Sequence, residues 1–503
     1  MELDPDACYR ALATRDARFD GRFFTGVRTT GIYCRPVCPA RTPRRENVRF
    51  FGSAAAAEAA GFRSCLRCRP ESSPDLAAWR GTSNTVSRAL ALIAEGGLDG
   101  AAVDTLAFRL GLGERQLRRL FRQHLGASPV AVAQTRRVLF ARQLLTETAM
   151  PLADVALAAG FGSVRRFNAT FRALYGSAPG ALRRAGQVAA AEPSGITLTL
   201  PYAPPYDWAA MADFLAARAI DQVERMDDAG RYHRSVALGG ARGTVSIAHD
   251  ARACGLRATI RFPAVAALAT LVGRIRRVFD LGADPLAIGR HLAADRLLAP
   301  LAAARPGLRV PGGWDGFELA VRAVLGQQVS VRAAARLAGR LVAAHGAPLD
   351  GGGPAGLARV FPEPAALLQL DAVALGMPRA RARTIETLAA AALRDPGLFR
   401  AGRSLDETVG RLVALPGIGE WTAHYIALRA AREPDAFPAS DAALLRVAAR
   451  LTGTRPNPAD LAARAEAWRP WRAYAAQHLW AADAAHHARA ASAALAEGDD
   501  DGT

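Results

Sequence analysis

The pattern of apolar and polar positions divides this 503-residue chain into parts with different periods. From about residue 80 to 185, and again from about 315 to 490, apolar residues recur with the spacing of one helix face. Between these parts, ITLTLPYA, GTVSIAHD and GLRATIRF alternate as strands do, while MADFLAARAI and VAALATLVGRIRRVF have helical spacing. The pattern predicts a multidomain protein that is mainly α, with α+β parts.

Changes in this pattern give the expected domain boundaries. The segment GQVAAAEPSG has the composition of a linker, and the acidic end of the chain has that of a disordered tail. We expect a small α+β domain at 1–78, a helical domain at 80–185, the linker at 186–195, a second α+β domain at 196–305, an all-α domain at 306–490 and the tail at 491–503.

The first helical part contains the same arrangement twice. VDTLAFRLGLGERQLRRLFRQHLGASP and LADVALAAGFGSVRRFNATFRALYGSAP each read as an apolar helix, a Gly-containing turn, an Arg-bearing helix and Gly-x-x-Pro. This repeat predicts two helix-turn-helix units, with an Arg-rich helical bundle of another kind as the alternative. Their expected core positions are Leu106, Leu110, Leu117, Leu120, Phe121, Val155, Phe161, Phe167 and Phe171.

Charge is concentrated in the same part of the chain. The net charge is +18, and residues 80–185, with 15 Arg and 6 acidic residues, carry half of it. Such a surface binds polyanions, and it predicts that this part holds the main phosphate contacts. No apolar run reaches the roughly 18–20 residues that span a bilayer, and no signal peptide is visible. We therefore expect a cytoplasmic protein that does not contact a membrane.

Four cysteines have the spacing of a metal site. Cys34 and Cys38 form C-x3-C, and Cys65 and Cys68 form C-x2-C after one loop. Two such thiol pairs can bind one tetrahedral Zn²⁺. On spacing alone, a zinc ion that only stabilises a small domain is the simpler interpretation, and the remaining cysteines, Cys8 and Cys254, are expected to be small buried apolar residues.

The residues around these cysteines allow a sharper interpretation. TTGIYCRPVCPAR, RRENVRFF and AAGFRSCLRC resemble the methyl-acceptor domain of Ada, and the double helix-turn-helix resembles the AraC-type DNA-binding domain. The resemblance implies that Cys34 takes a methyl group from a DNA methylphosphotriester while Cys38, Cys65 and Cys68 are the other zinc ligands. Methylation removes one negative charge beside the phosphates, so affinity for DNA rises and the protein becomes a transcriptional activator.

The same resemblance suggests which side chains contact DNA, with a solvated surface position as the alternative for Thr30, Arg41 and Arg63. The candidates beside the cysteines and on the two second helices are Thr30, Arg41, Arg63, Arg115, Gln116, Arg118, Arg119, Ser163, Arg165, Arg166 and Asn168. Most such contacts would position the protein on phosphates, and few would read bases.

A second motif lies far downstream. Leu415–Gly419 reads LPGIG and predicts a helix-hairpin-helix, in which Gly417 and Gly419 allow the backbone to approach a phosphate. Alone, this motif indicates only sequence-independent DNA binding. Asp441 follows in FPASDAALLRV, at the start of an apolar helix, where a helix N-cap is the alternative role.

Residues from about 196 to 485 resemble AlkA, an alkylbase DNA glycosylase of the helix-hairpin-helix superfamily. The resemblance rests on PPYDWAAMADFLAARA, ARPGLRVPGGWDGFELAVRAVLGQQVSV, LPGIGEWTAHYIALRA and WRPWRAYAAQHLW. It implies excision of 3-methyladenine-type bases from duplex DNA, with Asp441 as the catalytic acid residue. Trp421, Tyr425 and Trp480 would form the base pocket, with ordinary core packing as the alternative.

Two features of the resemblance concern the chemistry. Gln328 stands where the family commonly has an apolar wedge, so the energetics of base flipping are expected to differ. Bifunctional relatives carry a Schiff-base lysine at the position of Trp421, and this chain has no lysine, which implies a monofunctional enzyme.

The remaining expectations concern ligands and partners. The resemblance implies one Zn²⁺, duplex DNA that is alkylated or part of a promoter, a candidate monovalent cation at the hairpin, RNA polymerase as a candidate partner, and a monomer. The competing hypothesis is a damage-sensing transcription factor whose glycosylase-like half binds DNA without catalysis.

Overall fold

The computed structural model describes residues 4–74, 84–94, 96–185, 195–350, 354 and 356–500, with the backbone alone for residues 84, 184–185 and 490–500. The chain forms two compact units. Unit 1 comprises Met1–Pro204, Ala219–Asp284 and Val342–Phe361, and unit 2 comprises Pro205–Arg218, Pro285–Leu341 and Pro362–Thr503. The linker expected at 186–195 lies, except for Gly195, outside the described residues.

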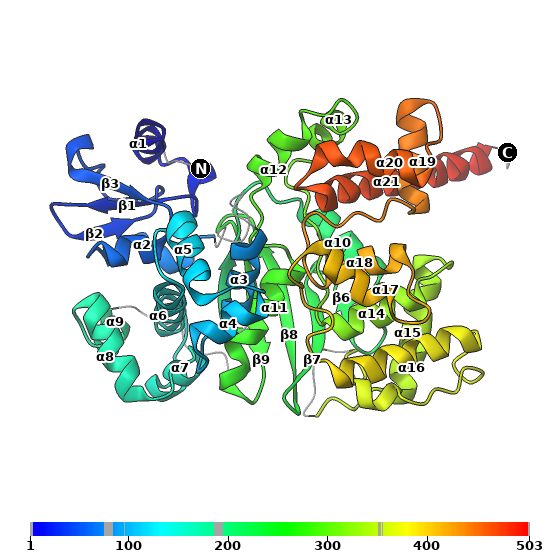
Figure 1. Ribbon diagram of the computed structural model, residues 1–503, viewed down its shortest axis with the longest axis horizontal. Helices are drawn as coiled ribbons and strands as arrows, with labels where there is room; N and C mark the ends of the chain where they lie inside the picture. Colours follow the sequence, from blue (N-terminus) through cyan, green and yellow to red (C-terminus); the bar gives the residue numbers. More distant parts are fainter. Residues whose placement is uncertain are drawn as a thin grey trace. The chain divides into compact units, whose positions relative to one another are not determined.

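The N-terminal part of unit 1 is built on a small mixed sheet with the strand order β3-β1-β2-β4 (blue in Figure 1). β1 pairs antiparallel with β2 and β3, and β4 pairs parallel with β2. Its elements are α1 (Pro5–Thr14), η1 (Ala17–Phe19), β1 (Phe24–Val27), β2 (Ile32–Cys34), η2 (Arg45–Asn47), β3 (Val48–Phe51), α2 (Ala54–Ala59), β4 (Arg63–Ser64) and η3 (Pro70–Ser72). Phe24, Tyr33 and Phe51 form its core against α2.

The helix-turn-helix units follow in the same unit (light blue to teal in Figure 1). Their elements are α3 (Asn84–Ala94), α4 (Val103–Arg109), α5 (Glu114–Leu125), α6 (Pro129–Glu147), α7 (Leu152–Ala158), α8 (Val164–Tyr175) and α9 (Pro179–Ala185). α5 and α8 each end at a glycine in the left-handed conformation, Gly126 and Gly176, which terminates the helix. The nine core positions expected from the sequence are all buried, except Leu120, which is partly buried against the core.

An antiparallel sheet with the order β5-β9-β8-β7-β6 completes most of unit 1 (Figure 1). Its strands are β5 (Ile196–Pro201), β6 (Glu224–Met226), β7 (Tyr232–Leu238), β8 (Ala241–Asp250) and β9 (Gly255–Arg261), followed by η5 (Val265–Ala267) and α11 (Leu268–Val278). The sequence analysis did not predict β6 and β7. Arg234 interrupts the apolar pattern of β7. It is nevertheless buried, and its guanidinium pairs with Glu224 of β6 at 2.7 Å.

Unit 2 is helical (Figure 1). Its elements are α10 (Trp208–Ala217), α12 (Pro285–Leu292), α13 (Ala299–Ala304), α14 (Gly316–Leu325), α15 (Val331–His345, whose end belongs to unit 1), η6 (Pro364–Leu367), α16 (Arg379–Arg394), α17 (Leu405–Val413), α18 (Glu420–Arg429), α19 (Ala442–Thr452), α20 (Pro458–Ala465), η7 (Glu466–Trp468) and α21 (Arg472–Asp500). α21 is helical through residues 491–500, where the sequence predicted a disordered tail.

The predicted fold class, a mainly helical multidomain protein with α+β parts, is confirmed. Within the described ranges, none of the helices combines the length and the apolar character that a membrane crossing requires.

Candidate metal centre and candidate active site

The four predicted cysteines converge in unit 1. Cys34 ends β2, Cys38 follows in the next turn, and Cys65 and Cys68 follow β4, which pairs with β2. Their sulfur atoms all lie within 4.8 Å of one another. Cys38, Cys65 and Cys68 are buried, whereas Cys34 is partly exposed. Cys34 is therefore the least buried of the four residues.

This donor set fits Zn²⁺. A tetrahedral ion with bonds of about 2.3 Å to sulfur places the sulfur atoms about 3.8 Å apart, and the Cys38 and Cys65 sulfurs are 4.0 Å apart. The backbone amide of Arg35 donates to the Cys68 sulfur at 3.3 Å.

A cavity of about 660 Å³ opens beside Cys34. Thr30, Arg41 and Arg63, which the sequence analysis had selected, are exposed and line it, and so do Phe171 and Tyr175 of α8. The partly exposed thiol therefore faces a cavity whose wall carries two arginines, as an anionic DNA backbone would require.

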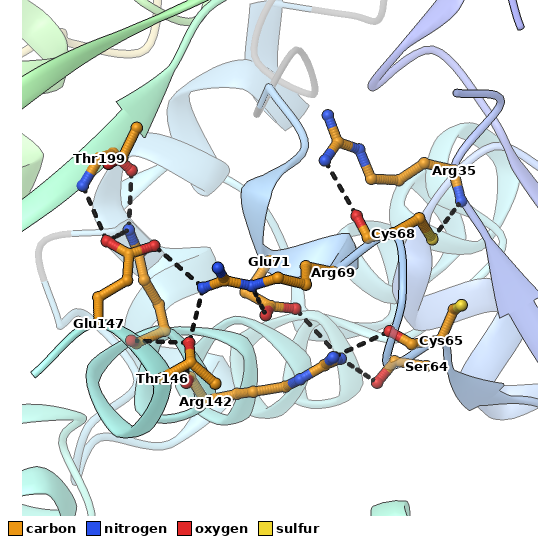
Figure 2. A network of polar contacts seen from close by, with 11 residues as sticks. Arg35, Ser64, Cys65, Cys68, Arg69, Glu71, Arg142, Thr146, Glu147 and Thr199 are labelled. Carbon is orange, nitrogen blue, oxygen red and sulfur yellow. Dashed lines mark hydrogen bonds and ion pairs between the residues drawn. The ribbon is translucent and has the colours of Figure 1, made fainter. Parts of the chain in front are cut away.

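A buried polar network connects the cysteine loop to α6, as Figure 2 shows. Arg142 of α6 is 1% exposed; it donates to Ser64 Oγ at 2.7 Å and to the Cys65 carbonyl at 2.9 Å, and it pairs with Glu71 at 3.1 Å. Arg69 joins Glu71 to the far end of α6. The sequence analysis missed this network because its members lie far apart along the chain.

The network continues to the edge of the second sheet. Glu147 at the end of α6 accepts from the backbone amide of Thr199 in β5 at 2.8 Å (Figure 2). Gln143 donates to the carbonyl of the same residue at 2.8 Å. Burial raises the pKa of Glu147. α6 thus satisfies both backbone groups of one residue on an edge strand.

The candidate DNA-contacting residues lie on the helices that the sequence predicted. Arg115, Gln116, Arg119, Arg165 and Arg166 are exposed on α5 and α8.

Three of the candidates have other contacts or are less exposed. Arg118 pairs with Glu114 within α5 at 2.5 Å, and Asn168 is half-buried. Ser163 is the N-cap of α8, where its hydroxyl accepts from the Arg166 amide. Cys8 is buried as predicted, whereas the prediction for Cys254 is wrong: it is half-buried in the left-handed turn between β8 and β9.

In unit 2, the predicted hairpin connects α17 to α18. Gly417 has φ +86°, and a Cβ there would lie 2.0 Å from Thr384 Oγ1, so the fold itself requires this glycine. Gly419 is the N-cap of α18, and a Cβ there would meet nothing within 4 Å. The bare backbone at Gly419 is therefore available to a molecule that approaches from outside.

Asp441 lies in a fixed position. It is the N-cap of α19, and its Oδ1 accepts from the amides of Ala443 and Leu444 at 2.9 and 3.2 Å. Two indole groups also donate to it: Trp480 Nε1 to Oδ1 at 3.0 Å and Trp421 Nε1 to Oδ2 at 2.8 Å. The helix cap and a catalytic role are compatible, because Oδ2 accepts only one of these hydrogen bonds.

The three predicted aromatic residues surround this carboxylate. Trp421 and Tyr425 are stacked with ring centroids 5.4 Å apart, and Trp480 lies edge-on to Tyr425 at 6.2 Å. All three are half-buried, so the alternative of ordinary core packing does not describe them fully. Burial opposes ionisation of Tyr425, but the charges of Arg429 and Arg218 outweigh burial and lower its pKa.

The residue at the expected wedge position has an unusual backbone. Gln328 is exposed and has φ +57°, a left-handed conformation that non-glycine side chains seldom adopt. The preceding residue, Gln327, anchors this loop by donating to the Gly417 carbonyl at 3.1 Å and to Thr422 Oγ1 at 3.0 Å. The loop that carries Gln328 is thus attached to the hairpin.

Unit 1 has a site of four cysteines and two helix-turn-helix units, and unit 2 has a hairpin followed by an acid with aromatic side chains around it. Together they define a zinc-binding, DNA-binding class of protein with a glycosylase-type site. Models of known families match in the same places: "Metal binding domain of Ada" at residues 7–71, "Helix-turn-helix domain" at 106–185, "AlkA N-terminal domain" at 197–315 and "HhH-GPD superfamily base excision DNA repair protein" at 321–473. With the cysteine geometry, the first match makes this a zinc site.

Similarity to individual proteins extends over nearly the whole chain. A "Probable bifunctional transcriptional activator/DNA repair enzyme AlkA" of Mycobacterium tuberculosis is 44% identical over 486 residues, which cover 95% of this chain and 97% of that protein. The chain belongs to the family of this bifunctional protein. "DNA-3-methyladenine glycosylase 2" of Escherichia coli is 39% identical over 56% of this chain and 96% of its own length. The solved 3-methyladenine DNA glycosylase of Archaeoglobus fulgidus, at 21% identity, has the same fold over 57% of this chain and 97% of its own, with a TM-score of 0.50.

Proposed function

We propose that this chain excises alkylated bases of the 3-methyladenine type from duplex DNA and also accepts methyl groups from DNA methylphosphotriesters on Cys34. The observation that supports excision best is the Asp441 carboxylate, held by the indole N–H groups of Trp421 and Trp480 inside an aromatic pocket. An anion fixed in this way stabilises the positive charge that develops on the deoxyribose as the glycosidic bond breaks.

Excision leaves the DNA strand intact under this proposal. The enzyme is monofunctional because the chain has no lysine to form a Schiff base, so water captures the sugar. Gly419 at the start of α18 offers its backbone to a DNA phosphate, and the hairpin carbonyls would hold a monovalent cation there. Potassium dependence of DNA binding tests the cation.

Release of free base from methylated duplex DNA tests the enzymatic half. The Asp441→Asn variant keeps the size of the side chain but loses the charge and one of the two oxygens that accept from the indole groups, so it should bind DNA and release no base. Undiminished release by Asp441→Asn would remove this residue from its proposed role. Base release that is absent from the unaltered, folded and DNA-bound chain would favour the alternative, a damage-sensing transcription factor with an inactive second half.

For the methyl acceptor, the supporting observation is the partial exposure of Cys34 beside a cavity that Arg41 and Arg63 line. When bound, zinc keeps the thiolate deprotonated and nucleophilic. Loss of one negative charge on methylation raises affinity for promoter DNA, where RNA polymerase is the proposed partner, and we propose that the chain acts as a monomer in the cytoplasm.

Intact-mass measurement tests methyl uptake. After incubation with methylphosphotriester DNA, the unaltered chain should carry one added methyl group and Cys34→Ala none. Cys8→Ala is the matched control, because Cys8 is a buried thiol outside the zinc cluster and its loss should not affect uptake. A methyl group on Cys34→Ala would place the acceptor at another residue.

A further inference from the structure

Arg429 is a buried cation that the proposed excision chemistry does not use. It is 3% exposed, and its guanidinium donates to the Pro311 carbonyl at 2.8 Å and to Gln477 Oε1 at 3.2 Å. No carboxylate among the residues that the structure describes forms a hydrogen bond or an ion pair with it. Burial lowers the pKa of Arg429 to about 10, so the side chain is still charged at neutral pH.

This charge lies against the rings of the base pocket. The guanidinium carbon is 5.1 Å from the centroid of Tyr425, 5.1 Å from that of Trp480 and 4.5 Å from that of Phe214. Since these rings are half-buried and Arg429 is buried, the cation is on their inward side. Arg218, which is half-buried, adds a second cation 3.9 Å from the Phe214 centroid.

A cation on the inward side of the rings weakens their attraction for a positively charged base on the exposed side. The π-electrons of the rings, which would attract a cationic alkylpurine, are already polarised toward Arg429. The positive charge of Arg429 also repels the positive charge of the base. Binding of a cationic base before reaction is therefore weaker than the aromatic residues alone would suggest.

The same charge assists bond cleavage. As the glycosidic bond breaks, its electron pair moves from the bond to the base nitrogen, and positive charge develops on the sugar, which water then captures while its proton passes to Asp441 or to solvent. A cation at the base end and a carboxylate at the sugar end both favour this shift of electrons. The base gains one unit of negative charge in either case, so the chemical step gains equally. A cationic base loses this gain again through weaker binding, whereas a neutral base does not.

We propose that Arg429 is a specificity-determining residue that acts through the pocket rings and shifts excision toward neutral, carbonyl-bearing purines relative to cationic alkylpurines. The inference rests on the proposed excision activity and extends it to the substrate class. For a base stacked about 8 Å from the guanidinium, at an effective dielectric constant of about 20, one charge changes the rate about tenfold to thirtyfold.

Single-turnover excision by the full chain tests this inference. The substrates are duplex oligonucleotides that carry one hypoxanthine, as the neutral probe, or one 7-methylguanine, as the cationic probe. Arg429→Met should lower the quotient of the maximal rate and the half-saturating protein concentration at least tenfold more for hypoxanthine than for 7-methylguanine, and it should lower the half-saturating concentration itself for 7-methylguanine. Arg429→Lys should restore most of the ratio, because it keeps the charge.

Gln477→Met is the matched control, since it removes a neutral hydrogen bond to Arg429 and leaves the charge. A merely structural role for Arg429 predicts that Arg429→Met lowers this quotient equally for both substrates, and that result would overturn the inference. If Arg429→Met does not fold, Arg218→Ala should shift the ratio in the same direction by about threefold, and an unchanged ratio would equally overturn it. Wild-type protein that releases neither base contradicts the proposed function itself, whereas release with an unchanged ratio in the variants contradicts this inference alone.

Discussion

The buried ion pair between Glu71 and Arg142 offers a quantitative test of how the zinc-binding domain is stabilised. Both side chains are 1% exposed, and Arg142 also donates to Ser64 and Cys65 beside the metal ligands (Figure 2). Glu71→Gln leaves the guanidinium buried without its counter-ion. Breaking a buried pair in this way costs about 3–5 kcal/mol, a large fraction of the ~5–15 kcal/mol that stabilises a typical domain.

The assay must follow this domain alone, because a chain of several domains does not unfold in one step. Cobalt bound to the four cysteines provides such a probe through its thiolate absorption. Urea unfolding followed at that signal should show a lower midpoint for Glu71→Gln, and zinc should be lost faster to a chelator. In the double variant Glu71→Gln/Arg142→Met, the loss should be smaller than the sum of the single losses, since no buried charge remains.

Glu46→Gln is the matched control. Its partner Arg44 is 3.9 Å away, and the two side chains are 66% and 84% exposed, so its removal should cost less than about 0.5 kcal/mol. Equal midpoints for Glu71→Gln and Glu46→Gln would refute the argument from burial.

Three further predictions follow from individual contacts. Gly417→Ala should destabilise the glycosylase half, because its Cβ would meet Thr384 Oγ1 at 2.0 Å. Gly419→Ala replaces an N-cap residue by a poorer one without a clash, so it should lower the unfolding midpoint much less and weaken DNA binding, and equal stabilities for the two variants would contradict this distinction. Trp421→Phe removes an indole N–H that donates to Asp441, the proposed catalytic residue, so single-turnover excision should slow about 10- to 100-fold with little change in DNA affinity. An unaltered rate would show that the hydrogen bond is dispensable. Burial raises the pKa of Glu58, so the folded state holds this proton more tightly than the unfolded state. The free energy of unfolding should therefore fall as pH rises from the pKa of the unfolded state through the raised pKa of the folded state. Glu58→Gln should lack this fall in urea titrations across pH, and an identical pH profile would show that Glu58 does not cause it.

The parts that the sequence predicted are those in which local pattern and chemistry agree. The helix-turn-helix repeat combines apolar spacing with glycine turns, and its expected core residues are buried, or partly buried in the case of Leu120. The four cysteines carry their own spacing rule and converge within 4.8 Å. Trp421 and Tyr425, spaced four residues apart, share one face of α18 and stack there.

The parts that the sequence did not predict depend on pairing between distant residues. β7 contains Arg234, which breaks the apolar alternation and is tolerated only because Glu224 lies opposite in β6. In the sequence, Arg142 cannot be told apart from the other basic residues of its helix, because its partners Glu71 and Ser64 are 71 and 78 residues away in the chain. Arg429 had a usable signal, because it follows Tyr425 by four residues on the same helix face.

Release of free base from methylated duplex DNA, with the products identified by mass, decides whether this chain is a glycosylase. We expect free 3-methyladenine or 7-methylguanine together with intact abasic strands, and neither base from the Asp441→Asn variant. If the protein is folded and bound to DNA but releases no base, it is a damage-sensing regulator with an inactive second half.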